Sequence, residues 1–298
     1  AGTWTDQGPI EQERLSQYLI KAAREQKLWT SWTHPAAALE QQLLDTITEL
    51  YADADVMGAF SDWYDFTSEA ARETVLARKA LQLTCLGVAD CYQSCETTQN
   101  YLVDPDNRRP ADFPALRAMA TKLGSHEPHT LAEEKFHLTR AILRLRRRRP
   151  DVFVGARAAY RPLPASSGHV VSFARGTESE VVVVASRLAR QMAVSGGFEG
   201  HTVVLPEGRW QDILTGREYD GGSIDLAGLL DRFPAAVLEE VSDTEGTTTM
   251  RAVLGALDRP TPTAPRPREA DDAGEGGLLG WLTRALGSGQ AGKEDADA

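Results

Sequence analysis

The hydrophobic pattern of this 298-residue chain changes its period at Pro150, and that change limits the folds open to it. Up to residue 148, apolar side chains recur at the three- and four-residue spacing of amphipathic helices. Beyond Pro150, short apolar runs are separated by Gly and Pro, which predicts an antiparallel β-sandwich. We predict helices over residues 10–27, 36–51, 53–66, 69–83, 113–123 and 130–148, and strands over residues 170–173, 181–184, 202–205, 210–214 and 235–238.

Composition predicts where the β-domain ends and a tail begins. The predicted β-domain covers residues 151–257. Four prolines between residues 260 and 267 then precede a run of acidic residues, and such a composition cannot bury enough apolar surface to fold. We therefore predict a disordered tail over residues 258–298, in which the apolar stretch 277–286 has the pattern of a short helix for contact with a partner.

Charge and composition also exclude several classes of function. A net charge of −11 argues against nucleic acid as a partner, and the basic cluster near residues 144–149 suits the C-terminus of a helix. The sequence has no run of 18 apolar residues and no basic-then-apolar leader, so we predict neither a membrane span nor a signal peptide. The three cysteines, Cys85, Cys91 and Cys95, fit no disulfide framework or zinc pattern, which favours a reducing, cytoplasmic compartment.

The segment Leu102–Pro110 gathers hydrogen-bonding groups in a short, stiff stretch. Two carboxylates, an amide and two guanidinium groups lie within Asp104–Arg109, and the flanking prolines disfavour a helix there. Such a loop suits a polyhydroxylated ligand, because Asp and Asn bind hydroxyls and Arg presents a planar fork of donors. The alternative is a loop that satisfies itself, with its two arginines paired with its two aspartates.

Several segments carry motifs of one known family, in the order that the family has. They are Gly2–Trp4, Lys21–Lys27, Thr30–Thr33, Gly87–Glu96, Val103–Pro110, Phe173–Gly176, Val181–Val184, Leu205–Trp210 and Asp212–Arg217. In these segments the chain resembles maltooligosyl trehalose synthase, a family of the α-amylase superfamily. The resemblance covers residues 1–240, and its most specific motifs are Thr-Ser-Trp-Thr and Asp-Pro-Asp-Asn-Arg-Arg-Pro.

The resemblance implies a fold and a set of site residues. Residues 1–150 would be the last part of a catalytic (β/α)8 barrel with inserted helices, with Leu86–Val88 as its eighth strand. The loop Asp90–Arg109 would then face the substrate at the C-terminal end of the barrel. The implied sugar-contacting residues are Trp32, Tyr92, Glu96, Asp104, Asp106, Asn107, Arg108 and Arg109. A core or helix-end position is the alternative for Trp32. No cofactor and no metal is implied.

The resemblance also implies an activity. The family isomerises the reducing-end α-1,4 linkage of maltooligosaccharides to α,α-1,1 by intramolecular transglucosylation, a step of trehalose biosynthesis. No residue of this chain matches the catalytic carboxylates that retaining chemistry of this kind requires. We therefore expect the chain alone to be inactive. Its expected partners are a maltooligosaccharide or glycogen-derived glucan and the missing N-terminal part of the barrel.

Two residues depart from the family pattern Gly-Val-Pro-Asp-x-Tyr-Gln-Gly-x-Glu. Ala89 stands at its Pro and Ser94 at its second Gly. A serine is strained at that position if the backbone φ is positive, because a side chain disfavours the left-handed region. These departures favour a second hypothesis, in which the chain is a non-catalytic glucan-binding or structural remnant.

Overall fold

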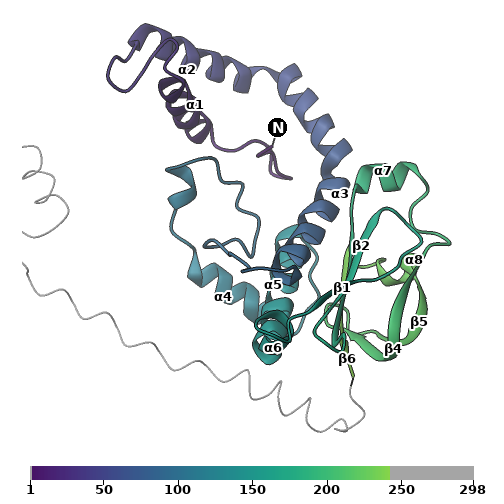
Figure 1. The fold of residues 1–298 in the computed structure, drawn as a ribbon. Helices are drawn as coiled ribbons and strands as arrows, with labels where there is room; N and C mark the ends of the chain where they lie inside the picture. The colour runs from purple at the N-terminus through teal and green to yellow at the C-terminus, as the bar shows by residue number, and fades with distance from the viewer. Residues whose placement is uncertain (1, 242–298) are drawn as a thin grey trace, which may run out of the picture. The chain divides into compact units, whose positions relative to one another are not determined.

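The structure, a computed structural model, describes residues 2–241, which comprise a helical part and a sheet (Figure 1). The tail predicted for residues 258–298 lies outside the described residues. The helices are α1 (Gln12–Gln26), α2 (Ala37–Ala52), α3 (Ala54–Thr84), α4 (Phe113–Lys122), α5 (Leu131–Arg148), α6 (Pro150–Phe153), α7 (Ala189–Val194) and α8 (Leu226–Leu229), with a 3-10 turn, η1, at Asp106–Arg108.

Local side chains explain where the long helices begin and why one of them continues. Asp53 accepts from two backbone N–H groups at the start of α3, and Thr130 forms a capping box with Glu133 at the start of α5. The helices predicted over residues 53–66 and 69–83 are in fact one helix. Thr67 and Ser68 lie between them, and their hydroxyls donate to carbonyls of the same helix, so they do not interrupt it.

Six antiparallel strands form a single sheet in the order β1-β2-β3-β6-β4-β5. They are β1 (Tyr160–Pro162), β2 (Val170–Arg175), β3 (Val181–Ser186), β4 (Thr202–Asp212), β5 (Glu218–Asp225) and β6 (Ala235–Glu240). The strand predicted over residues 202–205 and the first three residues of the one predicted over 210–214 belong to β4, which ends at Asp212. The pairing of β4 with β5 shifts register between Leu205 and Arg209. The prediction of a sandwich of two packed sheets is not confirmed, because all six strands are joined edge to edge.

Strand β3 lies between two hydrophobic clusters, and all six of its residues are buried. Successive side chains of a strand point to opposite faces. Val181 and Val183 accordingly pack in one cluster with apolar residues of α3 and α5. Val182 and Val184 pack in the other with Trp210 of β4. The helical part therefore supplies one of the two layers that cover the sheet.

A buried carboxylate also joins the helices to the sheet. Glu134 of α5 accepts hydrogen bonds from Arg72 of α3 at 2.6 and 2.7 Å and from Arg232 at 2.9 Å. Residues on both sides of Pro150 thus share a core and an ion pair, and the described residues 2–241 belong to one compact unit. The division into domains at residue 150 stays a prediction.

The segment Leu86–Val88 forms no strand among the described residues, so its place as the eighth barrel strand is not confirmed. Helix α3 ends at Thr84, and Leu86 and Val88 are 63% and 96% exposed. A barrel strand needs hydrogen-bonded neighbours on both edges. The described residues place no strand beside this segment. A run of three residues is too short for its periodicity to separate a strand from a loop.

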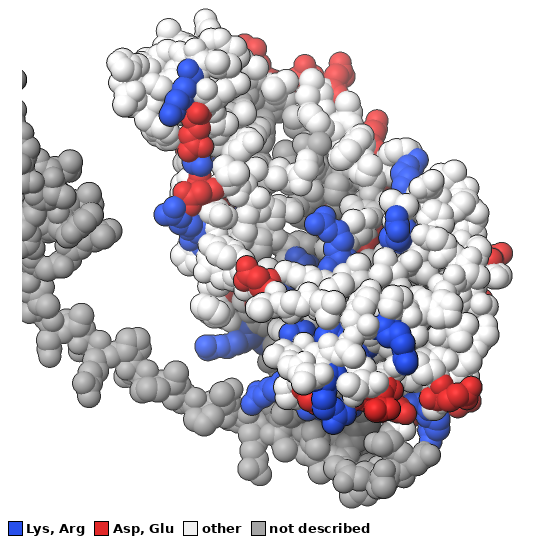
Figure 2. All heavy atoms as spheres, viewed as in Figure 1, with Lys and Arg blue, Asp and Glu red and all other residues white. Residues whose placement is uncertain are grey.

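The basic cluster at the end of α5 contacts the sheet. Arg148 lies 2.5 Å from Glu239, and Arg149 lies 3.9 Å from Glu180 and 3.8 Å from Glu239. Figure 2 shows basic and acidic side chains intermixed along the lower edge of this face. These pairs account for the cluster as part of the packing of α5 on the sheet. Among residues 2–241, no helix is long and apolar enough to cross a membrane.

Candidate functional site

The loop Asp90–Arg109 is held at several points by the helices around it. Gln82 of α3 donates to the carbonyl of Asp90 at 2.6 Å, and Lys135 of α5 donates to the carbonyl of Thr97 at 2.9 Å. Helix α1 makes a third contact through Arg14, whose Nη2 donates to the carbonyl of Asn100 at 3.0 Å. Because three helices fix its backbone, the loop can present side chains in a defined arrangement.

Asp106 is the charged anchor of this loop. Arg14 donates to both of its carboxylate oxygens at 2.9 Å, and the backbone N–H of Leu102 donates to one of them at 2.7 Å. These hydrogen bonds from Arg14, together with that from Leu102, hold the pKa of Asp106 at about 2. The predicted sugar ligand Asp106 is therefore engaged within the protein, and Arg14, which no motif singled out, is its partner.

The two arginines of the loop pair as the self-satisfied alternative predicts. Arg108 forms an ion pair with Asp104, and Arg109 lies 3.6 Å from Asp106. The guanidinium of Arg109 also lies 5.5 Å from the ring centroid of Tyr101, a cation–π contact. The Arg108 side chain is 69% exposed and that of Asp104 is 44% exposed, so this pair remains open to exchange with a ligand.

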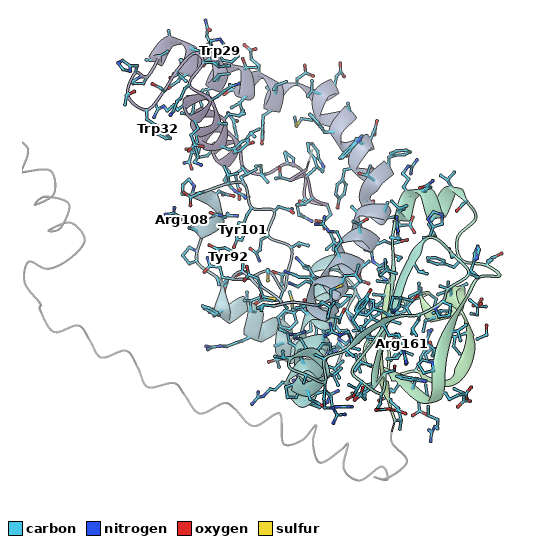
Figure 3. All side chains as sticks on the ribbon, viewed as in Figure 1. Trp29, Trp32, Tyr92, Tyr101, Arg108 and Arg161 are labelled. Carbon is cyan, nitrogen blue, oxygen red and sulfur yellow. The ribbon has the colours of Figure 1, made fainter. Side chains whose placement is uncertain are left out.

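The structure separates the other predicted residues into exposed and covered groups. Trp32 and Tyr92 are 56% and 52% exposed, whereas Glu96 and Asn107 are half-buried. The Oδ1 atom of Asn107 is buried and has no hydrogen-bond partner among residues 2–241. Figure 3 shows Tyr92 on the loop and Trp32 on the connection between α1 and α2, where the guanidinium of Arg24 lies 5.0 Å from its ring centroid. The exposed Trp32 is thus no core residue.

Ser94 occupies the left-handed region, with φ of 60°. The condition under which a serine is expected to be strained here, a positive φ, is therefore met. Ser94 is buried at 5% exposure, and its hydroxyl has no hydrogen-bond partner in the part of the chain that the structure describes. Its substitution for the glycine of the family pattern therefore costs conformational energy and a desolvated hydroxyl.

A cavity of ≈ 440 Å³ lies against the loop and α4. Tyr101, Arg109 and Asp112 give it polar groups, and Leu116 and Met119 give it an apolar wall. Its size falls within the usual range of small-ligand sites. No sequence pattern predicts this cavity, because its residues come from a loop and a helix that no motif connects. Within residues 2–241, no three His, Cys, Asp or Glu side chains are grouped to hold a metal ion.

Comparison with known proteins identifies relatives of this chain. No protein-family model matches the chain. A Mycobacterium tuberculosis protein named as a maltooligosyl trehalose synthase is 36% identical over 222 residues, which are 72% of this chain and 27% of that protein. The structure of maltooligosyltrehalose synthase from Arthrobacter ramosus matches with a TM-score of 0.71 and 35% identity, over 78% of this chain and 31% of that one. A Sulfolobus tokodaii structure described as a hypothetical maltooligosyl trehalose synthase matches with a TM-score of 0.57 and 25% identity, over 77% and 29% of the two chains.

The helical part, the sheet and the motif-bearing loop together place the chain among proteins related to trehalose-forming synthases. Within that class the chain belongs to the maltooligosyl trehalose synthase family and corresponds to its C-terminal portion. It spans 27–31% of the length of the relatives named above.

Proposed function

We propose that this chain is the C-terminal part of a cytoplasmic maltooligosyl trehalose synthase, and that its loop Asp90–Arg109 contacts the maltooligosaccharide. The observation that carries the proposal is the combination of family membership with a loop fixed by α1, α3 and α5 that leaves Tyr92 and Arg108 exposed. The aromatic ring of Tyr92 offers an apolar face to a sugar ring, and the guanidinium of Arg108 offers donors to its hydroxyls.

We propose different roles for the predicted sugar-contacting residues according to their exposure. Trp32, Tyr92, Arg108 and Asp104 present exposed groups, whereas Asp106 acts through the loop backbone because Arg14 occupies both of its oxygens. We therefore assign Asp106 a positioning role, together with the half-buried Asn107 and Glu96. Arg109 lies over the ring of Tyr101 and lines the cavity, so we propose that it contacts the sugar only there.

Retardation of the chain in a native gel that contains amylose tests the binding step. The expected result is slower migration that added maltohexaose reverses. Trp32→Ala and Tyr92→Ala are expected to weaken retardation about tenfold each, the effect of losing one stacked ring. Trp29→Ala is the matched control, because Trp29 lies on the same α1–α2 connection, is 68% exposed and falls outside the family motif (Figure 3). Equal effects of the two tryptophan variants would contradict the assignment of Trp32.

The catalytic step requires carboxylates from the remainder of the barrel. We expect no conversion of maltohexaose by the 298-residue chain, because nucleophile and acid supply most of the rate in this chemistry. The test mixes the chain with the N-terminal part of the Arthrobacter ramosus enzyme that precedes the matched region, and follows the loss of reducing ends. Recovered activity in the mixture supports the proposal. Conversion by the chain alone contradicts it.

One observation favours the second candidate, a glucan-binding remnant. The strained Ser94 stands within the loop that carries Tyr92, so the loop departs from its relatives where substrate contact is proposed. Amylose retardation without conversion in the complemented mixture is the result expected of this candidate. Absence of both binding and conversion leaves a structural role.

A further inference from the structure

Two cysteines of the loop meet a buried lysine. Lys79 of α3 is 5% exposed, and its Nζ lies 3.3 Å from Sγ of Cys95 and 3.9 Å from Sγ of Cys91. The same ammonium donates to Oε1 of Gln82 at 2.9 Å. The two thiols thus share one ammonium group as their neighbour. All three cysteines of the chain are free in the structure, so this pair is two reduced thiols converging on one cation.

One positive charge lies beside the pair and stabilises a thiolate there, although the surroundings as a whole raise the pKa of Cys91. A second ammonium, that of Lys135, lies close enough for Lys79 to lower its pKa, after the larger effect of burial. Within residues 2–241, Lys79 forms no ion pair with a carboxylate, and its ammonium donates hydrogen bonds to Gln82 and the two thiols. Burial raises the pKa of the Cys91 thiol, and the Lys79 ammonium opposes that effect. A cation beside a thiol is the usual setting of a reactive cysteine.

We propose that Cys91 and Cys95 are an oxidation site that forms an intramolecular disulfide with hydroperoxides, with Lys79 as the positioning residue that stabilises the attacking thiolate. Cys91 is exposed and so accessible to the oxidant, and Cys95 is half-buried behind it as the resolving thiol. Both occupy the unspecified positions of the family pattern around Tyr92, and the proposal is independent of the proposed glucan binding.

The reaction balances with hydrogen peroxide as the oxidant. The thiolate of Cys91 attacks one peroxide oxygen, the O–O bond breaks, and the departing hydroxide takes a proton to become water. The resulting sulfenic acid is then attacked by the sulfur of Cys95, which displaces the second oxygen as water and forms the S–S bond. Two thiols are oxidised by two electrons and one peroxide is reduced. The product ring encloses Tyr92, Gln93 and Ser94 of the proposed substrate loop.

The test uses the full 298-residue chain with Cys85→Ser, which leaves only the two thiols in question. After treatment with hydrogen peroxide, thiol titration under denaturing conditions is expected to fall from two thiols to none. The intact mass is expected to fall by two hydrogen atoms, and dithiothreitol should restore both. A covalent dimer on a non-reducing gel, an irreversible gain of oxygen, or thiols that persist while free glutathione is oxidised would each overturn the proposal.

Variants test the parts of the site separately. In the Cys85→Ser background, Cys91→Ser and Cys95→Ser should each abolish the monomeric loss of two hydrogens. Lys79→Gln is expected to slow disulfide formation about tenfold, and Lys79→Arg to keep the wild-type rate to within a few-fold, because the charge is retained. Since a buried lysine can also affect folding, circular dichroism checks each variant, and rates are compared only among folded proteins. Equal rates for folded Lys79→Gln and wild type would overturn the role given to Lys79. None of these readouts depends on glucan binding.

Discussion

Asp106→Asn is the substitution whose effect the structure predicts most directly. The change keeps an oxygen for the backbone N–H of Leu102 but removes the charge that Arg14 binds with two hydrogen bonds of 2.9 Å. The side chains of Arg14 and Asp106 are 16% and 15% exposed, so water replaces their contact poorly. We expect the substitution to lower the free energy of unfolding by about 2 kcal/mol. This value lies between the contribution of an exposed ion pair and that of a buried hydrogen bond to a charged group.

The same pair predicts a dependence on pH. The pKa of Asp106 is about 2 in the folded chain and has an ordinary value of 3.8, so the folded state favours the ionised form. Its contribution is complete above the ordinary pKa and is lost as the pH falls toward the folded value. We therefore expect the stability difference between wild type and Asp106→Asn to be full at pH 6 and to shrink between about pH 4 and pH 2.

Urea unfolding followed by circular dichroism at a series of pH values measures both effects. The matched control is Asp104→Asn, because Asp104 pairs with an arginine of the same loop through more exposed side chains. We expect that control to cost less than about 0.5 kcal/mol. A double-mutant cycle with Arg14→Met assigns the Asp106 effect to the pair. Equal losses for the two asparagine variants, or a difference for Asp106→Asn that persists unchanged at pH 2, would refute the reasoning.

Three further predictions concern stability. Arg175 is fully buried and donates to carbonyls of Thr84 and Ala159 among others. Arg175→Met should therefore lower the free energy of unfolding, measured by chemical denaturation, by about 3 kcal/mol. Arg147 is exposed, so the control Arg147→Met should change stability little. Ser94→Gly should raise the thermal midpoint, with a gain of about 1 kcal/mol, because glycine accepts the positive φ; a loss of stability would contradict the strain. Burial raises the pKa of Asp212, whose carboxylate accepts from Leu214, Val237 and Thr215. Asp212→Asn keeps one acceptor oxygen and should cost less in calorimetry than Asp212→Ala, which should cost about 3 kcal/mol. Equal losses would refute this.

The sequence predicts elements well where the hydrophobic period is unbroken. Helices α1, α2, α4 and α5 and strands β2, β3 and β6 lie where the period places them, because periodicity reports which side of an element is buried. Periodicity does not report which strands become neighbours, so the single sheet was missed. The three-residue β1 and the polar β5 gave no apolar run to detect.

The candidate site shows a similar limit. The motif located the loop and the pairing of Arg108 with Asp104, since those residues are four positions apart. It could not locate Arg14, which is 92 positions from Asp106 in sequence and lies on a helix face with no distinguishing pattern. Contacts of this kind are created by tertiary packing, which a single sequence does not encode in local spacing.

The shared core of α3 and the sheet has a consequence for the order in which the chain acquires structure during synthesis. The carbonyl of Arg232 accepts from Arg72, 160 positions earlier, and the buried face of α3 packs beside Val237 of β6. Helix α5 covers part of this face, but the part that packs on β6 stays uncovered until nearly all of the described residues have left the ribosome. Contacts across such long separations form slowly and leave hydrophobic surface uncovered in the meantime. Until the last strand has been synthesised, this exposed apolar surface of the helical part is open to binding by chaperones.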